Sequence, residues 1–363
     1  MKVAIVHDWL VTNGGAEKVL KEIIELYPNA DIFSLVDFLN QKERKEILKR
    51  KIAKSSFIQK LPFVRNHFRN YLPLFPKAIE SLDVRGYDLI ISSSWAVAKG
   101  VKKNQNQLHI CYCHTPIRYA WDLYEEYTSS LGQPKKFLAQ KSLQYIRKWD
   151  RDTLNRVDFF IANSHFVQKR IQRIYNRKAK VIYPPVDIKK FGLYEQKEDF
   201  YLTASRLVPY KKTKLIVEAF NAMPEKKLIV IGTGEEYEKI KKIAKPNITL
   251  LGYQSDKNLV YYMQRAKAFV YAAIEDFGIA PIEALSCGTP VIALNQGGTA
   301  ETIIDKINGI HFLNQTTSDI IAAIKRFEKE EFDYKQIRES SLQYSNFKEQ
   351  FKTYIDGLCK EFL

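Results

Sequence analysis

Short apolar runs alternate with helical patterns along the whole 363-residue chain. Such runs are typical of parallel sheets, whose crossover helices bury the strands on both faces. The expected strands of the first half are Lys2–His7, Ala30–Val36, Asp88–Ser93, Leu108–His114, Val157–Ala162 and Lys180–Val186. Those of the second half are Asp199–Ser205, Lys227–Ile231, Ile248–Gly252, Ala268–Ala273, Pro290–Leu294 and Gly309–Leu313. Two such series predict an α/β protein with two doubly wound, Rossmann-like domains that face each other across a cleft.

The expected linker lies at 183–200, where a Pro-Pro step is followed by a polar stretch. The predicted domains are therefore residues 1–190 and 195–344. Residues 345–363 form an aromatic-rich amphipathic pattern, which predicts a docking helix.

Positive charge is concentrated in the first half. The net charge is +16, and residues 1–194 carry 34 basic and 18 acidic side chains. Within them, residues 41–80 hold 11 basic residues and three Glu, interleaved with Phe57, Leu61, Phe63, Phe68, Tyr71, Leu72, Leu74 and Phe75. Such a surface favours an anionic partner, either a membrane leaflet or a nucleic acid. The alternative is a solvated basic face on an ordinarily packed helix.

The remaining composition indicates a cytoplasmic chain. The four cysteines, Cys111, Cys113, Cys287 and Cys359, fit a reducing compartment and show no zinc-ligand spacing. The N-terminal "MKVAIVHDWL" is typical of a first strand and not of a signal peptide. No run of about 18 apolar residues is present, so no transmembrane helix is expected.

Two loops of the first half follow expected strands. In "HDWLVTNGGAEKVL", Gly14 and Gly15 allow close approach of the backbone to a ligand at a helix start, although many such turns are only turns. The loop lacks both the G-x-G-x-x-G fingerprint and the P-loop pattern. In "HICYCHTPIRYAWD", His114 stands at the carboxyl end of a strand, where ligands of parallel sheets bind, and a structural role is the alternative.

A third loop, "TASRLVPYKKTKLI", carries Arg206 and Lys211 after the first strand of the second half. Two fixed cations here can clamp a diphosphate, one through a planar fork and one as a point charge. The alternative is a pair of exposed charges.

The fourth loop is "YAAIEDFGIAPIEALSCGTPVIAL". Gly278 permits a tight strand-to-helix turn, after which the amides of Gly278, Ile279 and Ala280 would face an anion. Glu283 is expected in the first helical turn, and Glu275 would reach another part of the same ligand. The alternative, that both acids are helix-start caps, gives no reason for Glu275.

Taken in order, these segments resemble retaining GT-B glycosyltransferases of family 4 (group 1). The motifs are "GGAEKV", "HTP", "SRLVPYKK", "EDFGIAPIE" and "GTPVIA…GGTAETI", and the resemblance covers nearly all of the chain. The segments "CYCHTPIRYAWD" and "SSSWAVAKGV" are similar to a subgroup that builds bacterial surface polysaccharides, lipopolysaccharide among them, often with GDP-mannose as donor.

The resemblance implies a role for each site. Arg206 and Lys211 would hold the donor diphosphate with the amides at 278–280, and Glu283 would bind the ribose. Glu275 and His114 would contact the donor sugar. Gly14 and Gly15 would approach the phosphates or the acceptor, and the base would stack near Gly252 and Tyr253. The last helix, 345–363, would return to the first domain.

The resemblance also implies the reaction. A hexose, with mannose from GDP-mannose favoured over a UDP-sugar, would pass to a lipid-linked or oligosaccharide acceptor with retention of configuration and without a metal or other cofactor. The basic residues 41–80 would hold the enzyme at the inner face of the plasma membrane. The tripeptide Asp150-Arg151-Asp152 imitates a metal-binding Asp-x-Asp but lies in a helical pattern. A large ring at Trp95, where the subgroup has a polar residue, would alter the acceptor pocket.

Three other classes of protein fit the sequence less well than a glycosyltransferase. No nucleic-acid motif accompanies the charge, the missing glycine fingerprint argues against an oxidoreductase, and a sugar-nucleotide epimerase or phosphorylase-like protein remains an alternative on a related fold.

Overall fold

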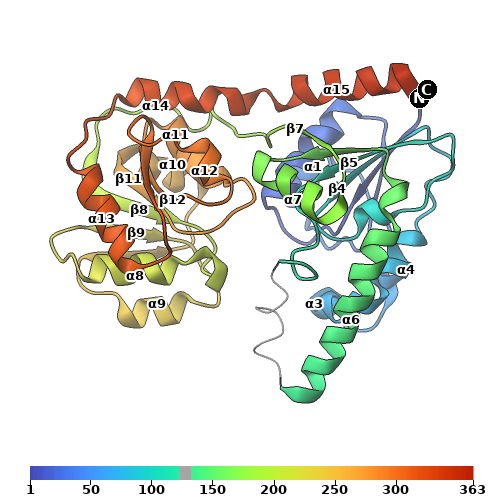
Figure 1. Ribbon diagram of the computed structural model, residues 1–363, viewed down its shortest axis with the longest axis horizontal. Coiled ribbons are helices and arrows are strands. Elements are labelled where there is room, and N and C mark those ends of the chain that lie inside the picture. The colour runs from blue at the N-terminus through green and yellow to red at the C-terminus, as the bar shows by residue number, and fades with distance from the viewer. Residues whose placement is uncertain (123–131, 363) are drawn as a thin grey trace. The chain divides into compact units, whose positions relative to one another are not determined.

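The computed structural model describes residues 1–122 and 132–362 (Figure 1). The chain divides into two compact units. Unit 1 comprises Met1–Pro185 and Phe347–Leu363, and unit 2 comprises Val186–Asn346. Each unit has its own parallel sheet with helices on both faces (Figure 1).

The sheet of unit 1 has the strand order β3-β2-β1-β4-β5-β6-β7, and every pairing is parallel. Its strands are β1 Val3–His7, β2 Asp31–Ser34, β3 Lys54–Ser55, β4 Leu89–Ser94, β5 Leu108–Cys113, β6 Phe159–Ala162 and β7 Ala179–Val181. The prediction lacked only β3, because two residues are too short to show a periodic pattern.

Alternate residues of β1 enter opposite cores of unit 1. Val3 and Ile5 pack with α1 and α15, whereas Ala4 and Val6 pack with α4 and α6. This is the two-sided burial expected of a parallel sheet. The α-helices in the described part of unit 1 are α1 Gly15–Leu26, α2 Gln41–Ile47, α3 Val64–His67, α4 Phe75–Glu80, α6 Gln133–Asp152, α7 His165–Tyr175 and α15 Phe347–Phe362. Its 3-10 helices are η1 Phe57–Lys60, η2 Phe68–Leu74, η3 Ala98–Gly100 and η4 Leu154–Arg156.

The sheet of unit 2 has the order β10-β9-β8-β11-β12-β13, again entirely parallel. Its strands are β8 Glu198–Ala204, β9 Leu228–Ile231, β10 Ile248–Gly252, β11 Ala266–Tyr271, β12 Val291–Leu294 and β13 Gly309–Phe312. All six expected strands are present, so the α/β class with two parallel sheets is confirmed.

Helices α8 and α13 pack on one face of this sheet, and α10 and α11 contact strands from the other. The α-helices of unit 2 are α8 Thr213–Asn221, α9 Tyr237–Ile243, α10 Asp256–Arg265, α11 Ile279–Ser286, α12 Thr299–Thr302, α13 Thr317–Phe327 and α14 Tyr334–Ser341. Its 3-10 helices are η5 Pro209–Lys211 and η6 Leu342–Ser345. In the described part of the chain, we find no helix with the length and apolar character needed to cross a bilayer.

Candidate active site

The carboxyl ends of the strands of unit 2 meet at one edge of its sheet, because all the strands are parallel. The loops at this edge carry most of the residues that the sequence singled out. Arg206 and Lys211 follow β8, Gly252 and Tyr253 lie at the end of β10, and Glu275 to Ala280 follow β11. The structure therefore brings these segments to one edge.

Lys211 and Glu275 form an ion pair at this edge. Lys211 Nζ lies 2.6 Å from Glu275 Oε1 and 3.2 Å from the hydroxyl of Tyr271, the last residue of β11. Both charged side chains are mostly buried, at 16% and 18% exposure. Burial alone would lower the pKa of Lys211, but Glu275 and Tyr271 raise it well above its ordinary value. Lys211 is thus a permanent cation.

Arg206 lies in the same loop but is exposed. Its Nη2 donates to the hydroxyl of Tyr210 over 2.9 Å, and Lys211 Nζ lies 5.5 Å from the centre of the same Tyr210 ring. Tyr210 therefore contacts both predicted phosphate-binding cations. A guanidinium has five N–H donors, so Arg206 keeps donors for an anion beside its bond to Tyr210.

The turn before α11 has the predicted form. Gly278 adopts a φ of 90°, which favours glycine, and the helix begins at Ile279. The first N–H groups of the helix, including those of Ile279 and Ala280, have no acceptor within it.

Glu283 occupies a different place from the one predicted. It is buried at 6% exposure, and it lies beyond the first turn of α11, which contains no acidic residue. The first-turn prediction is wrong because the helix starts at Ile279, one turn before Glu283. No side chain caps this helix, so the alternative that both acids are caps does not hold.

Two further glycine-rich loops lie at the same edge. Sequence reasoning did not single out the first, and it quoted the second only within a family motif. Gly232 and Gly234 follow β9, and a Cβ at Gly232 would lie 1.8 Å from the carbonyl oxygen of Ser205. Gly297 follows β12, and a Cβ there would lie 2.4 Å from the carbonyl oxygen of Glu275. Both loops therefore press against the segments that carry Arg206 and Glu275. The G-x-G after an expected strand was the signal that could have found the first.

The end of β10 presents an exposed aromatic ring. Gly252 has a φ of 64° and is the last residue of the strand. Tyr253 is 79% exposed, so its ring is open to a stacking partner.

In unit 1, the Gly14-Gly15 loop stands between β1 and α1. Gly15 is the first residue of α1, and the N–H of Gly14 donates to Glu17 Oε2 over 2.9 Å. Gly14 has no side chain, so this bond is only one half of a capping box. That amide is consequently engaged within the protein.

His114 follows β5 and is bound by its neighbours. Its Nε2 lies 2.8 Å from Ser93 Oγ, which in turn lies 3.1 Å from Nδ1 of His7. Burial, with His7 nearby, lowers the pKa of His114 to about 3, so its ring is neutral. His7 and Ser93 were not candidate site residues, and no local sequence signal links them, because β1, β4 and β5 become neighbours only in the sheet.

Trp95 lies directly beside these histidines. Its ring meets those of His7 and His114 edge-on, with centroid distances of 4.8 and 5.7 Å. Its backbone is held by Asp8, whose carboxylate accepts N–H groups from each of residues 95–98 at 2.6–2.9 Å. Trp95 is therefore firmly placed at the surface that contains His114.

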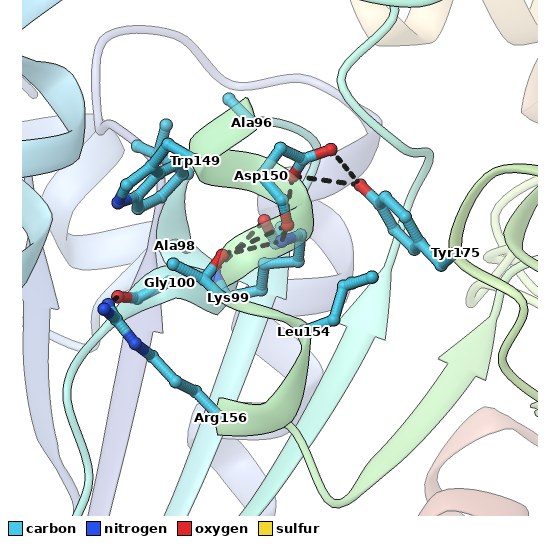
Figure 2. Close-up of polar contacts among 12 residues, drawn as sticks. Ala96, Ala98, Lys99, Gly100, Trp149, Asp150, Leu154, Arg156 and Tyr175 are labelled. Atoms are coloured by element: carbon cyan, nitrogen blue, oxygen red, sulfur yellow. Dashed lines mark hydrogen bonds and ion pairs between the residues drawn. The ribbon is translucent and has the colours of Figure 1, made fainter. Parts of the chain in front are cut away.

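Asp150 belongs to a buried network, shown in Figure 2. Its Oδ1 lies 2.8 Å from Nζ of Lys99, and its Oδ2 accepts from Trp121 and Tyr175. A Cβ at Gly100, next to Lys99, would collide with the Trp149 ring at 2.2 Å. The first aspartate of the Asp150-Arg151-Asp152 tripeptide thus pairs with Lys99 inside unit 1. The second, Asp152, is exposed.

The basic segment 41–80 only partly matches its predicted surface. Phe68 and Phe75 are in the core, and Leu61, Tyr71 and Leu72 pack against it. Phe57, Phe63 and Leu74 remain exposed. Five of these eight aromatic and leucine side chains therefore pack in or against the core.

Comparison with solved structures defines the class of the fold. The chain aligns with Anabaena HepE in complex with UDP and glucose at a TM-score of 0.68 and 17% identity, over 98% of this chain and 100% of that one. At this identity the likeness shows the fold alone. It is the GT-B fold of glycosyltransferases.

Family models identify the chain further. "Glycosyltransferase Family 4" matches residues 13–190, and "Glycosyl transferases group 1" matches residues 186–344. The chain belongs to the family 4, group 1 glycosyltransferases.

Curated relatives are distant. An uncharacterised glycosyltransferase of Methanocaldococcus jannaschii is 27% identical over 52% of this chain and 54% of its own length. The alpha-1,3/1,6-mannosyltransferase ALG2 of Saccharomyces cerevisiae is 26% identical over 48% of this chain and 47% of its own. The chain thus spans about half the length of these curated relatives.

Proposed function

We propose that this glycosyltransferase moves a hexose, mannose from GDP-mannose, to a lipid-linked or oligosaccharide acceptor in the synthesis of a bacterial surface polysaccharide. The observation that carries the proposal is the buried Lys211–Glu275 pair at the carboxyl edge of the unit 2 sheet. It combines a permanent cation for a phosphate with a carboxylate that can accept sugar hydroxyls. The likeness to yeast ALG2, a mannosyltransferase, supports the choice of sugar.

The proposed donor contacts are divided among the loops of that edge. Arg206 and Lys211 bind the diphosphate together with the amides at 278–280. Glu275 binds the sugar, Glu283 the ribose, and Tyr253 with Gly252 the base. In unit 1, His114 contacts the sugar, and the Gly14-Gly15 loop lies near the phosphates or the acceptor.

The proposed reaction retains the anomeric configuration. The acceptor hydroxyl attacks the anomeric carbon from the face of the leaving group, the bond from that carbon to the phosphate oxygen breaks, and the leaving oxygen takes the acceptor proton. Arg206 and Lys211 stabilise the charge that develops on the phosphate, a role that a divalent metal has in other transferases. We therefore expect full transfer in EDTA, and a strict loss of activity there would contradict this part.

A thermal-shift panel of nucleoside diphosphates tests the donor. A ligand that binds only the folded protein stabilises it by about 2.7 kcal/mol at 100 times its Kd. GDP at saturation is expected to raise the Tm by roughly 5 °C, and Lys211→Met is expected to remove the shift. The exposed Lys214 pairs with Glu218 on α8, so Lys214→Met provides the matched control.

A UDP-sugar is the second candidate donor. The solved structure of Anabaena HepE with UDP and glucose favours it. A larger shift with UDP than with GDP would select this donor and overturn the mannosyl proposal.

The membrane part of the proposal rests on the exposed residues of segment 41–80. Phe63 is 83% exposed and adopts a φ of 53°, a left-handed conformation that is unusual for a bulky residue. Exposed Lys60, Arg65 and Arg69 flank it along the chain. Each basic residue near an anionic leaflet contributes about 1 kcal/mol of attraction. We propose that this surface holds the enzyme at the cytoplasmic face of the plasma membrane.

Vesicle flotation tests this surface. Binding to anionic vesicles and not to neutral ones is expected, and Phe63→Ser is expected to weaken it. Leu313, an exposed leucine of unit 2 at 64%, provides the control variant Leu313→Ser. Equal flotation with neutral vesicles would contradict the membrane part without affecting the donor site.

A further inference from the structure

A chain of four polar side chains joins the start of α1 to His114 inside unit 1. Glu17 Oε1 lies 3.7 Å from His7 Nε2, and His7 Nδ1 lies 3.1 Å from Ser93 Oγ. Ser93 Oγ lies 2.8 Å from His114 Nε2. We call Glu17, His7, Ser93 and His114 the relay. Register explains its middle link, because His7 and Ser93 are paired residues of β1 and β4.

Because most of the relay is buried, its polar atoms can form hydrogen bonds mainly with one another. His7 and Ser93 have no exposed surface, and Glu17 is 4% exposed. His7 Nε2 is buried and has no hydrogen-bond partner among the residues that the structure describes. The carboxylate of Glu17 is therefore the polar group that faces it. In such a setting, the positions of protons are decided by neighbouring side chains and not by water.

The proton positions follow from donor and acceptor rules. An ionised carboxylate only accepts, so the single-proton tautomer of His7 that suits Glu17 carries its proton on Nε2, and its Nδ1 accepts. Ser93 has a single hydroxyl proton, which it then donates to His7 Nδ1. Ser93 Oγ is left to accept from His114, which must carry its proton on Nε2.

We propose that Glu17 and His7 are positioning residues that hold His114 as the Nε2–H tautomer. The Nδ1 lone pair of His114 is then free to accept a hydrogen bond from a hydroxyl of the transferred sugar. The last step of this proposal rests on the function proposed above. The preceding steps concern unit 1 alone. Glu17 thereby links the Gly14-Gly15 loop, whose amide it also binds, to the state of the histidine.

Histidine-selective ¹⁵N labelling tests the tautomer directly. The chain has only six histidines, and His114→Asn assigns the signal of interest. At pH 8 we expect His114 to be protonated on Nε2 and unprotonated on Nδ1. A signal showing the proton on Nδ1 in the wild-type protein would overturn the proposal, and this measurement needs no substrate and no variant that might misfold.

Glu17→Gln tests the origin of the tautomer. Its oxygen still accepts the Gly14 amide, but its NH₂ group now donates toward His7 Nε2. Donor and acceptor should then exchange in each hydrogen bond of the relay, and His114 should shift toward the Nδ1–H form. Glu43→Gln is the matched control, because Glu43 has the same capping-box position at the start of α2. An unchanged His114 signal in Glu17→Gln would overturn the proposal.

Ser93→Ala gives a second test through the middle link. It should release His114 into a mixture of tautomers. Ser92→Ala is the control, since Ser92 makes an equivalent buried bond to His109 Nε2 over 2.8 Å from the same strand. If both variants change the His114 signal alike, the effect is not specific to the relay and the proposal fails.

Turnover separates this proposal from the proposed function. With the donor found to bind, Glu17→Gln should lower kcat by about tenfold, the lower end of what the loss of a histidine's orienting partner costs at metal sites, with little change in KM. If the tautomer is as expected but His114→Asn transfers sugar normally, the sugar contact is wrong. If no nucleotide binds at all, the proposed function fails while the tautomer result stands.

Discussion

The candidate site of unit 2 and that of unit 1 stabilise their buried polar side chains in different ways. In unit 2, Lys211 and Glu275 are opposite charges from two loops, and each stabilises the other in a mostly buried position. In unit 1, His114 is neutral, and a sequence of hydrogen bonds through Ser93 and His7 decides where its proton lies. The first arrangement supplies charge, whereas the second supplies a directed lone pair.

This difference determines how each site should fail. Loss of one member of an ion pair leaves the other charge buried without compensation, which is costly at once. Substitution of Glu17 or Ser93 in the relay leaves both histidine rings in place and changes the positions of protons. The following predictions test this contrast, from the largest effect to the smallest.

Lys211→Met should have the largest effect. The substitution removes the cation that we propose for the leaving phosphate and deprives Glu275 of its Lys211 partner. Transfer should then fall by about 10³-fold, about 4 kcal/mol of transition-state stabilisation. Steady-state kinetics against Lys214→Met measures the loss. Turnover within a factor of ten of the wild-type value would show that the ion pair is structural.

Acid should weaken unit 1 through its neutral histidines. Burial lowers the pKa of His114 to about 3 and that of His109 to about 4, below the ordinary value. The unfolded chain therefore binds protons first as the pH falls below about 6.5, and the folded form loses stability from there toward pH 3–4. Between pH 7.5 and pH 5, we expect each histidine to cost about 2 kcal/mol.

Tryptophan fluorescence during urea unfolding measures this effect in unit 1 alone, because Trp9, Trp95, Trp121 and Trp149 all belong to it. His114→Gln should reduce the dependence on pH, whereas exposed His67→Gln should not. An identical acid dependence in the wild type and His114→Gln would contradict a neutral His114 ring.

Tyr271→Phe should have the smallest effect. It removes one hydroxyl from Lys211 but leaves Glu275 in place, so the expected loss is about 1 kcal/mol, roughly fivefold in turnover. Tyr201→Phe removes a comparable hydroxyl contact, 3.0 Å from Glu328, and serves as the control. A loss of turnover as large as that of Lys211→Met would mean that activity depends on the Tyr271 hydroxyl and not on the Lys211–Glu275 pair.

The sequence was sufficient for the architecture because buried parallel strands leave a local signal. Runs such as Val3–His7 and Val291–Leu294 were found within a residue or two of their observed ends. The Gly278 turn was also readable, since a glycine between a strand and a helix is typical of a backbone with positive φ. The two-residue β3 was not, because it is too short to show a periodic pattern. The position of Glu283 beyond the first turn of α11 was not found either.

The candidate site was less accessible from the sequence. Lys211 and Glu275 could be named, but their pairing depends on the adjacency of β8 and β11, which are far apart in the chain. Ser93 and His7 gave no signal because an apolar strand pattern contains them both. Nor did the sequence indicate that Asp8 accepts four successive amides.

Helix α15 has a consequence for how the protein is made. Phe347 and Phe351 meet the ring of Tyr112 at 5.8 and 6.3 Å, and Tyr112 meets His114 at 5.1 Å. A ribosome working at 5–20 residues per second needs roughly ten to thirty seconds to translate unit 2 before this helix emerges. During that interval, the apolar surface of α1 that α15 later covers is open to chaperones, and the environment of His114 is incomplete. Helix α15 thus completes the surroundings of His114 only after unit 2 has been translated.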